Sequence, residues 1–409
     1  MSLLSIDAQT KENKGNALAI GKEARDAKSK DSSVIDSTIG MLFDEEGEFY
    51  TFDSVKKALE SLTDKQKYAY GSTIGDPAYH EALYKWIFKG IYEDIKENMH
   101  LRCVATPGGS GAICNTFSNY LDEGDKVLIP SLMWTNYIQV AKEEHLGYET
   151  YQLFDDNDHF NLYDFKFKCQ KLKEEQGRVL VVINDPCQNP TGYSMSNYEW
   201  SKVVDILNEI SMDGTPVILL YDLAYIDYDK RGFIESRNNI KLFKRFNENV
   251  LAILAFSGSK TLGLYGLRIG AQICMAKTAS IADDFIRAND FSARGKWSMT
   301  SVLGQNIITK VFNDFNVEFV QELNDARELL IKRANTFLEE AKRLGLKHYP
   351  YDCGFFVTIP CSNVEGVTKE LNKRGLYIIP LKVGIRLTLS SITVDEIIRA
   401  VKIISEVLK

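Results

Sequence analysis

The chain of 409 residues has no apolar run long enough to cross a bilayer, and residues 7–31 lack the apolar core of a signal peptide. Seven cysteines, an odd number without C-x-x-C spacing, indicate reduced thiols in a cytoplasmic protein. Five histidines show no metal-ligand pattern, so we expect no catalytic metal. The net charge of −7 argues against nucleic acid or an anionic membrane as the main partner.

Hydrophobic residues are plentiful, at 44% of the chain, and the length exceeds that of one ordinary core. Near-continuous apolar segments alternate with helical patterns, which is typical of a mostly parallel sheet covered by helices on both faces. We therefore expect an α/β fold with a large sheet domain and a smaller α+β domain. The expected boundaries are 1–62 for an N-terminal arm and part of the small domain, 63–315 for the large domain and 316–409 for the small C-terminal domain.

Periodicity predicts the individual elements. The segment 17–30 is charged and fits either a helix or an extended arm. The expected strands are 34–40, 126–130, 178–185, 216–222, 250–257, 269–275, 354–359 and 385–389. The expected helices are 52–62, 78–95, 198–210, 319–344 and 394–408, together with one that opens in the stretch 106–112 and runs to about residue 120.

The stretch 257–270 places a lysine, Lys260, just after a buried strand. Open α/β sheets bind ligands at the carboxyl ends of their strands. Ser257 and Arg268 lie close in sequence, so the site suits an aldehyde that carries a phosphate. The amine would form a Schiff base, and the hydroxyl and guanidinium would hold the phosphate. Taken alone, the pattern also fits a surface lysine in a glycine-rich turn.

Four more loops follow expected strands. Asp222 ends one strand, where a carboxylate can pair with a protonated pyridine nitrogen, and Tyr225 can reach a ring hydroxyl. Each loop also has a plainer interpretation: a helix N-cap at Asp222, a structural turn at Asn189, a glycine turn at 108–111, or a core tryptophan at Trp134. The common place of these loops at strand ends of one sheet favours a binding site.

In this order, the motifs resemble those of the class I aminotransferases, which are pyridoxal-phosphate enzymes of fold type I, and of their aspartate and aromatic amino acid branch in particular. The resemblance runs from about Val34 to the C-terminus and places pyridoxal 5'-phosphate in the large domain. The motifs are Ser257-x-x-Lys260 with Gly263-Leu264-Tyr265 and Arg268, Asn189-Pro190-Thr191-Gly192, Asp222-x-x-Tyr225, and Arg386 before a late strand.

The resemblance implies a role for each candidate residue. Lys260 would bind the cofactor and then move the substrate proton, while Asp222 would pair with the pyridine nitrogen. The family further implies a homodimer with shared active sites. The other implied contacts are Tyr225 and Asn189 to the ring oxygen, Gly109, Ser110, Ser257 and Arg268 to the phosphate, Trp134 stacked on the ring, Arg386 and Gly40 to the substrate α-carboxylate, and Tyr70 to the partner subunit's phosphate.

Two positions depart from the family pattern. The aspartate branch often has a histidine three residues after the stacking tryptophan, and this chain has Tyr137 there. The loop expected to reach the partner subunit spans 294–298. Arg294 falls where the aspartate branch keeps an arginine for the side-chain carboxylate, and Trp297 replaces the usual tyrosine. The amino acid substrate is therefore open between acidic and aromatic.

Three functions fit these residues. The first is transamination between an amino acid and a 2-oxo acid such as 2-oxoglutarate, by a ping-pong mechanism through pyridoxamine phosphate. The second is a lyase or decarboxylase that uses the same lysine, which Arg386 disfavours because it would retain the carboxylate. The third is a non-catalytic ligand sensor on this fold. Such regulators carry an added DNA-binding domain. We expect no room for one, because only about thirty residues precede the fold.

Overall fold

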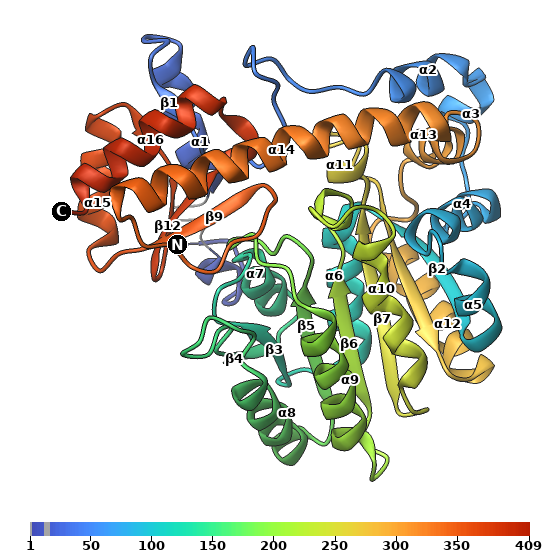
Figure 1. Ribbon diagram of the computed structural model, residues 1–409. Helices are drawn as coiled ribbons and strands as arrows, with labels where there is room; N and C mark the ends of the chain where they lie inside the picture. The colour runs from blue at the N-terminus through green and yellow to red at the C-terminus, as the bar shows by residue number, and fades with distance from the viewer. Residues whose placement is uncertain (1, 12–16) are drawn as a thin grey trace.

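The computed structural model describes residues 2–11 and 17–409, and a seven-stranded sheet lies at its centre (Figure 1). The strand order is β2-β8-β7-β6-β5-β3-β4, and β8 alone runs antiparallel to its neighbours. This arrangement confirms the expected α/β fold with a mostly parallel sheet. The strands are β2 (His100–Thr106), β3 (Lys126–Pro130), β4 (Gly147–Tyr151), β5 (Val179–Asn184), β6 (Val217–Asp222), β7 (Val250–Ser257) and β8 (Gly270–Ala276).

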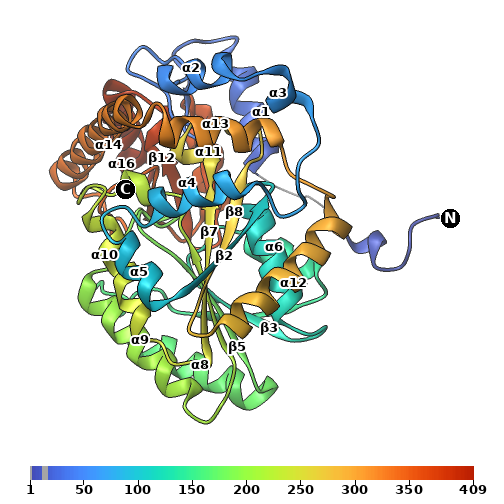
Figure 2. The same cartoon turned by 90° about the vertical axis from the view of Figure 1, so that its right-hand side faces the viewer.

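Helices cover both faces of this sheet, which explains why its strands are apolar throughout. On β5, Leu180 and Val182 join one buried cluster, while Val181 and Ile183 join another on the opposite face. Figure 2 shows α6 and α12 on one side of the sheet and α8 and α9 on the other. The helices are α6 (Gly108–Tyr120), α7 (Asn136–Glu143), α8 (Leu162–Gln176), α9 (Asn197–Ser211), α10 (Asn238–Lys241) and α12 (Ala279–Lys296).

A second group of strands is built from both ends of the chain. Strand β1 (Ile35–Asp36) pairs in parallel with β10 (Leu376–Tyr377). Strands β11 (Ile379–Leu381), β12 (Gly384–Thr388) and β9 (Phe356–Pro360) form an antiparallel sheet in that order. The helices beside them are α1 (Ala17–Lys28), α15 (Val364–Lys373) and α16 (Val394–Val407). The boundaries expected at residues 62 and 315 stay a prediction.

The long helix α14 (Asn316–Leu344) connects the two groups of strands. It packs on α13 (Val302–Asn313) and α2 (Asp53–Ser61) at one end and on α16 at the other (Figure 1). None of the helices in the ranges 2–11 and 17–409 is long and apolar enough to cross a membrane. The remaining elements are α3 (Asp64–Tyr68), α4 (Pro77–Ile87), α5 (Tyr92–Asn98), α11 (Gly258–Thr261) and short 3-10 turns at Ala8–Thr10, Ile226–Tyr228, Glu235–Arg237, Leu242–Arg245 and Leu389–Ser391.

The single helix expected over residues 78–95 is wrong, because the segment forms α4 and α5. Gly90 between them has φ +81°, in the left-handed region, so the chain turns there. The apolar pattern continues across the turn because Trp86 of α4 and Ile95 of α5 pack into the same core. Periodicity alone therefore gives no sign of the break.

The strand expected over residues 34–40 is also wrong in extent, because β1 ends at Asp36. The Asp36 carboxylate accepts a hydrogen bond from the backbone N–H of Thr38 at 3.1 Å. Such a local bond between a side chain and the backbone competes with strand pairing and turns the chain. The turn leaves Gly40 outside the ladder, close to the carboxyl edge of the large sheet.

Candidate active site

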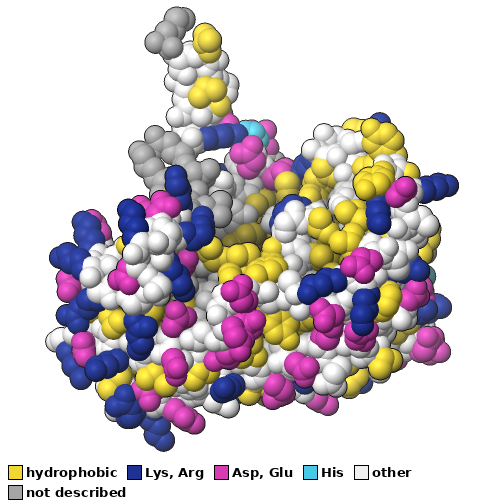
Figure 3. Space-filling view, turned by 90° about the horizontal axis from the view of Figure 1, so that it is seen from above, with side chains coloured by type: hydrophobic (Ala, Val, Ile, Leu, Met, Phe, Trp, Pro, Cys, Tyr) yellow, Lys and Arg dark blue, Asp and Glu magenta, His cyan; other side chains and the backbone are white. Residues whose placement is uncertain are grey.

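The five loops that carry the candidate side chains lie at one edge of the large sheet. Strands β2, β3, β5, β6 and β7 run in the same direction, so their carboxyl ends meet there. This edge faces α11 at the top of Figure 1. The view from that side shows a hollow lined by hydrophobic side chains (Figure 3).

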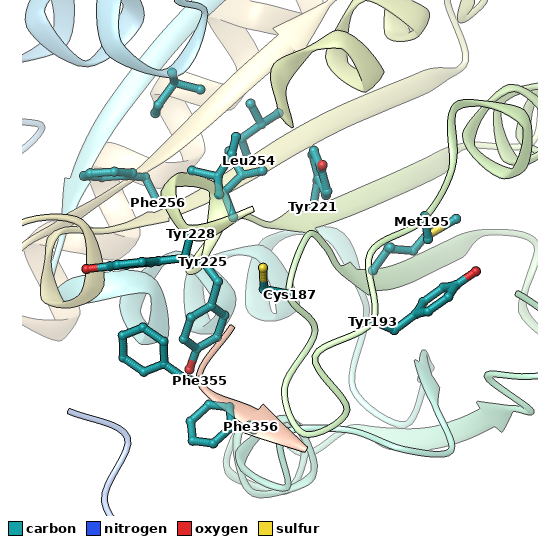
Figure 4. Packing of buried hydrophobic residues seen from close by; sticks show 14 of the residues in the cluster. Cys187, Tyr193, Met195, Tyr221, Tyr225, Tyr228, Leu254, Phe256, Phe355 and Phe356 are labelled. Atoms are coloured by element: carbon teal, nitrogen blue, oxygen red, sulfur yellow. The ribbon is translucent and has the colours of Figure 1, made fainter. Parts of the chain in front are cut away.

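Lys260 lies in α11, directly after β7, among aromatic rings. Its Nζ donates a hydrogen bond to the backbone carbonyl of Gly40. The same atom lies 4.8 Å from the ring centre of Tyr265, 5.5 Å from that of Phe355 and 5.8 Å from that of Tyr225. Figure 4 shows Phe355 and Phe356 beside Tyr225 in this packed region. The amine is therefore enclosed by apolar surface on several sides.

Burial lowers the pKa of Lys260 from its ordinary value to about 7, and the positive charges of Arg386 and Arg268 act in the same direction. A substantial share of the amine is therefore uncharged near neutral pH. An uncharged amine can attack a carbonyl carbon, whereas an ammonium ion cannot. The geometry thus provides a nucleophile at neutral pH.

A buried network holds the backbone of this lysine from behind. Thr261 Oγ1 donates to Asp227 Oδ2 at 2.6 Å, and Asp227 forms a fully buried ion pair with Arg237. The hydroxyl of Tyr228 donates to the Lys260 carbonyl at 2.8 Å. Loss of one partner of such an ion pair costs about 3–5 kcal/mol, because the other charge stays buried. These positioning residues were not predicted from the sequence.

Asp222 is buried at the end of β6, and its carboxylate accepts hydrogen bonds from two donors. Its Oδ2 accepts from the hydroxyl of Tyr137 at 2.6 Å, and its Oδ1 accepts from the backbone N–H of Ala224 at 3.1 Å. Burial raises the pKa of Asp222, while these hydrogen bonds oppose the rise. Trp134 packs edge-on against Tyr137, with ring centres 5.6 Å apart. Tyr137 thus takes the position of the family's histidine as a neutral donor.

Arg386 and Asn189 meet on the other side of Lys260. Arg386 Nη1 donates to Asn189 Oδ1 at 3.3 Å and Nη2 to the Thr38 carbonyl at 3.2 Å, while the guanidinium stacks 4.2 Å from the ring centre of Phe356. Asn189 also acts to lower the pKa of the Tyr225 hydroxyl, against the rise that burial causes. The buried Nε of Arg386 has no partner among the residues that the structure describes. A free guanidinium donor here fits an anionic ligand such as a carboxylate.

The start of α6 forms a second anion site. No side chain caps its first turn, which contains Gly109 and Ser110, so backbone N–H groups there are open to a ligand. Gly108 has φ +69°, and a Cβ on it would lie 2.7 Å from Arg268 Nη2. Only glycine therefore lets the guanidinium approach the helix. A Cβ built on Gly109 would lie 3.5 Å from the Cβ of Ser257, so these candidates surround one space.

Two residues fix Arg268 and the lysine loop: Ser259, which was not predicted from the sequence, and Tyr265, which was predicted only as part of a motif. Arg268 Nη1 donates to Ser259 Oγ and to the backbone carbonyl of Tyr265, both at 3.0 Å. The Tyr265 hydroxyl accepts from the backbone N–H of Leu42 at 3.0 Å. An amine, a phosphate cradle and a buried carboxylate thus lie along one edge, and these residues fit the expected pyridoxal phosphate.

Tyr70, Arg294 and Trp297 are not brought into this cluster. Tyr70 is 94% exposed. The expected loop 294–298 is wrong in part, because Arg294 to Lys296 form the last turn of α12, where periodic helix signals weaken. Arg294 is exposed and donates to Ser298 Oγ at 2.7 Å. Within residues 2–11 and 17–409 of this single chain, neither Tyr70 nor Arg294 forms a hydrogen bond or ion pair with the cluster.

Comparisons with known proteins give a consistent picture. The sequence pattern of the family described as "Aminotransferase class I and II" matches residues 33–404. An aspartate aminotransferase of Salmonella typhi is 26% identical over 316 residues, which cover 75% of this chain and 76% of that protein. A tyrosine aminotransferase of Rhizobium meliloti strain 1021 is 28% identical over 356 residues, covering 84% and 86%.

A solved structure has the same fold along the whole chain. The crystal structure of an aminotransferase from Anaerococcus prevotii DSM 20548 superposes with a TM-score of 0.95 and 29% sequence identity, over 100% of both chains.

The lowered pKa of Lys260 predicts an unusual pH dependence in the cofactor-free protein. Competitive labelling with a trace of acetic anhydride, read by mass spectrometry, should show Lys260 labelling rise through about pH 7 and level off, while an ordinary lysine titrates near pH 10.4. Arg386→Gln should move the Lys260 transition to higher pH. Between about pH 7 and 10 the Lys260 amine is protonated in the unfolded chain and mostly neutral in the folded protein. The burial of Lys260 therefore lowers the free energy of unfolding in full below about pH 7, and this loss of stability fades as the pH rises toward about 10. A transition near pH 10 would contradict the assignment.

Proposed function

The chain belongs to the class I and II aminotransferases, and from this premise we propose that it exchanges an amino group between aspartate or an aromatic amino acid and a 2-oxo acid such as 2-oxoglutarate. It is an aminotransferase of the aspartate and aromatic type. The observation that supports the proposal most is the amine of Lys260 near two guanidinium groups, those of Arg386 and Arg268. Burial and their charges lower the pKa of the amine to about 7, and Arg386 Nε, unpaired among the described residues, is free to bind an anion.

The family uses pyridoxal phosphate. When bound, this group supplies an aldehyde for the amino group and a ring that stores the electron pair of the broken Cα–H bond. The start of α6 with Ser257 and Arg268 would hold the phosphate, and Trp134 would cover the ring. Asn189 and Tyr225 would bind the ring oxygen.

The chain's own residues then act on the substrate. Arg386 binds the α-carboxylate, with Gly40 beside it, and this fixes the direction of the Cα–H bond. Lys260 Nζ would take the proton from the substrate Cα and hold it for the return transfer. Asp222, which accepts a hydrogen bond from Tyr137, would pair with the ring nitrogen of the cofactor. A second half-reaction with the 2-oxo acid runs through the same steps in reverse.

A homodimer with shared active sites is part of the proposal. Tyr70 and Arg294 are polar-ended, exposed side chains without contacts to their own chain's cluster, as expected of residues that complete the partner's site. Tyr70 would reach the phosphate of the partner subunit, and Arg294 would reach the side chain of its substrate.

We also propose a cytoplasmic location. All seven cysteines are free thiols in the structure. Reduced thiols without pairing suit a reducing compartment.

The proposed reaction is tested by single turnovers of the pyridoxal-phosphate form against a panel of amino acids. Absorbance should show loss of the aldehyde form, with one equivalent of 2-oxo acid released. Asp222→Asn should keep the cofactor but slow this step by several orders of magnitude, because a neutral amide cannot stabilise the charged ring nitrogen. Release of carbon dioxide and an amine would instead identify a decarboxylase, and unchanged rates in Asp222→Asn would refute the role of Asp222.

Arg294 decides the substrate class. If its guanidinium pairs with a side-chain carboxylate, Arg294→Ala should raise the barrier for aspartate and glutamate by about 2–5 kcal/mol and leave tyrosine and phenylalanine nearly unchanged. Arg287→Ala is a matched control, since Arg287 is an exposed arginine of the same helix. Values of kcat/KM for the four amino acids decide the matter: equal losses for all of them would mean that Arg294 supports the helix end or the dimer.

A further inference from the structure

A cysteine, a lysine and a glutamate meet outside the site described above, where α6, the end of α7 and the end of α12 come together. Lys296 Nζ lies 3.2 Å from Cys114 Sγ and 2.7 Å from Glu144 Oε1. The thiol itself donates to Glu144 Oε1 at 2.8 Å. Lys296 Nζ also donates to Ser118 Oγ at 2.8 Å. Each of the three N–H bonds of the ammonium thus has its own acceptor, which fixes the nitrogen beside the sulfur.

Cys114 differs from the other thiols in its surroundings. Five of the seven cysteines are buried, and only Cys114 and Cys361 are partly exposed. Among the residues that the structure describes, Cys114 is the one thiol with a hydrogen bond to an amine. Solvent can reach part of Cys114, so a small oxidant has access to the residue, and an amine already in contact with the sulfur can trap the product.

We propose that hydrogen peroxide converts this pair into a covalent sulfur–nitrogen cross-link between Cys114 and Lys296. The cross-link would join α6 to α12 within one chain. Figure 2 shows the two helices side by side on the same face of the sheet.

The first step oxidises the sulfur. Cys114 Sγ attacks one oxygen of hydrogen peroxide, the O–O bond breaks, and the sulfur becomes a sulfenic acid while the peroxide is reduced to water. Burial, and then the hydrogen bond to Glu144, raise the pKa of Cys114 to about 11. The thiol therefore keeps its proton at rest. Glu144 is placed to take that proton as the sulfur attacks and to pass it to the leaving hydroxide, which becomes the water and leaves Glu144 as a carboxylate again.

The second step forms the cross-link. The ammonium of Lys296 loses a proton through Glu144 to solvent, and its nitrogen attacks the oxidised sulfur. The S–N bond forms, the S–O bond breaks, and the hydroxyl leaves as a second water. One thiol, one ammonium and one peroxide thus give one cross-link, two waters and one proton. An added thiol reverses the cross-link by attack on its sulfur.

The position of the cross-link connects the helix that starts at the candidate active site with the helix end that carries Arg294, whose part in the partner's site rests on the proposed function. Cys114 lies one helical turn after Ser110 at the start of α6, and Lys296 lies two residues after Arg294. A bond between them would hold the end of α12, and with it Arg294, against the helix that begins at the phosphate cradle.

The test uses the full-length, cofactor-loaded protein. After treatment with hydrogen peroxide and alkylation of free thiols, peptide mapping should find the peptides of Cys114 and Lys296 joined, with a mass lower by two hydrogen atoms. Dithiothreitol should separate them. Lys296→Gln and Cys114→Ser should both abolish the joined peptide, while Cys361→Ser, which removes the other partly exposed thiol, should leave its yield unchanged.

Three results would overturn the proposal. Cys114 could accumulate as a sulfinic or sulfonic acid with Lys296 unmodified. Cys114 could pair with a cysteine, within the chain or between copies. The joined peptide could also survive in Lys296→Gln, which would place the nitrogen on another residue. Circular dichroism of each variant before treatment separates loss of the cross-link from loss of the fold.

Discussion

The amine of Lys260 lies in a partly buried place among aromatic rings and near the positive charges of Arg386 and Arg268, and most features of the site follow from the cost of an ammonium charge there. Burial together with Arg386 and Arg268 favours the neutral amine. The burial itself comes from β7, whose residues are covered on both faces and which ends directly at α11. Arg386 Nε, on β12, is buried without a partner in the described part of the chain. A carboxylate at Arg386 and a phosphate at Arg268 would therefore satisfy both guanidinium groups.

Loops that follow parallel strands were predictable from sequence, because strand direction brings them to one edge whatever their exact contacts. Strand direction predicted that the loops of Lys260, Asp222 and Asn189 share one edge of the sheet, and the structure shows this. The chemical roles of the three residues stay predictions. The fold class is confirmed for the same reason, since doubly covered strands are apolar throughout. The split of the segment 78–95 was not predictable, because α4 and α5 share one core and only the φ of Gly90 separates them.

Contacts between distant residues were beyond sequence reasoning. Nothing in the local pattern connects Thr261 with Asp227, although this buried hydrogen bond positions the backbone next to Lys260. Tyr137 was recognised as a departure from the family, but its hydrogen bond to Asp222 required the structure. A phenol donates without becoming charged near neutral pH, since burial raises its pKa further. The support of Asp222 in this chain therefore does not titrate as a histidine would.

The central claim is that Lys260, and no other lysine, is the amine that binds the cofactor. Reduction of the pyridoxal-phosphate form with sodium borohydride fixes the cofactor to its lysine, and peptide mapping then identifies the residue. The geometry predicts one pyridoxyl label per chain, on Lys260, and none in Lys260→Ala. A stoichiometric label on any other lysine would contradict the claim.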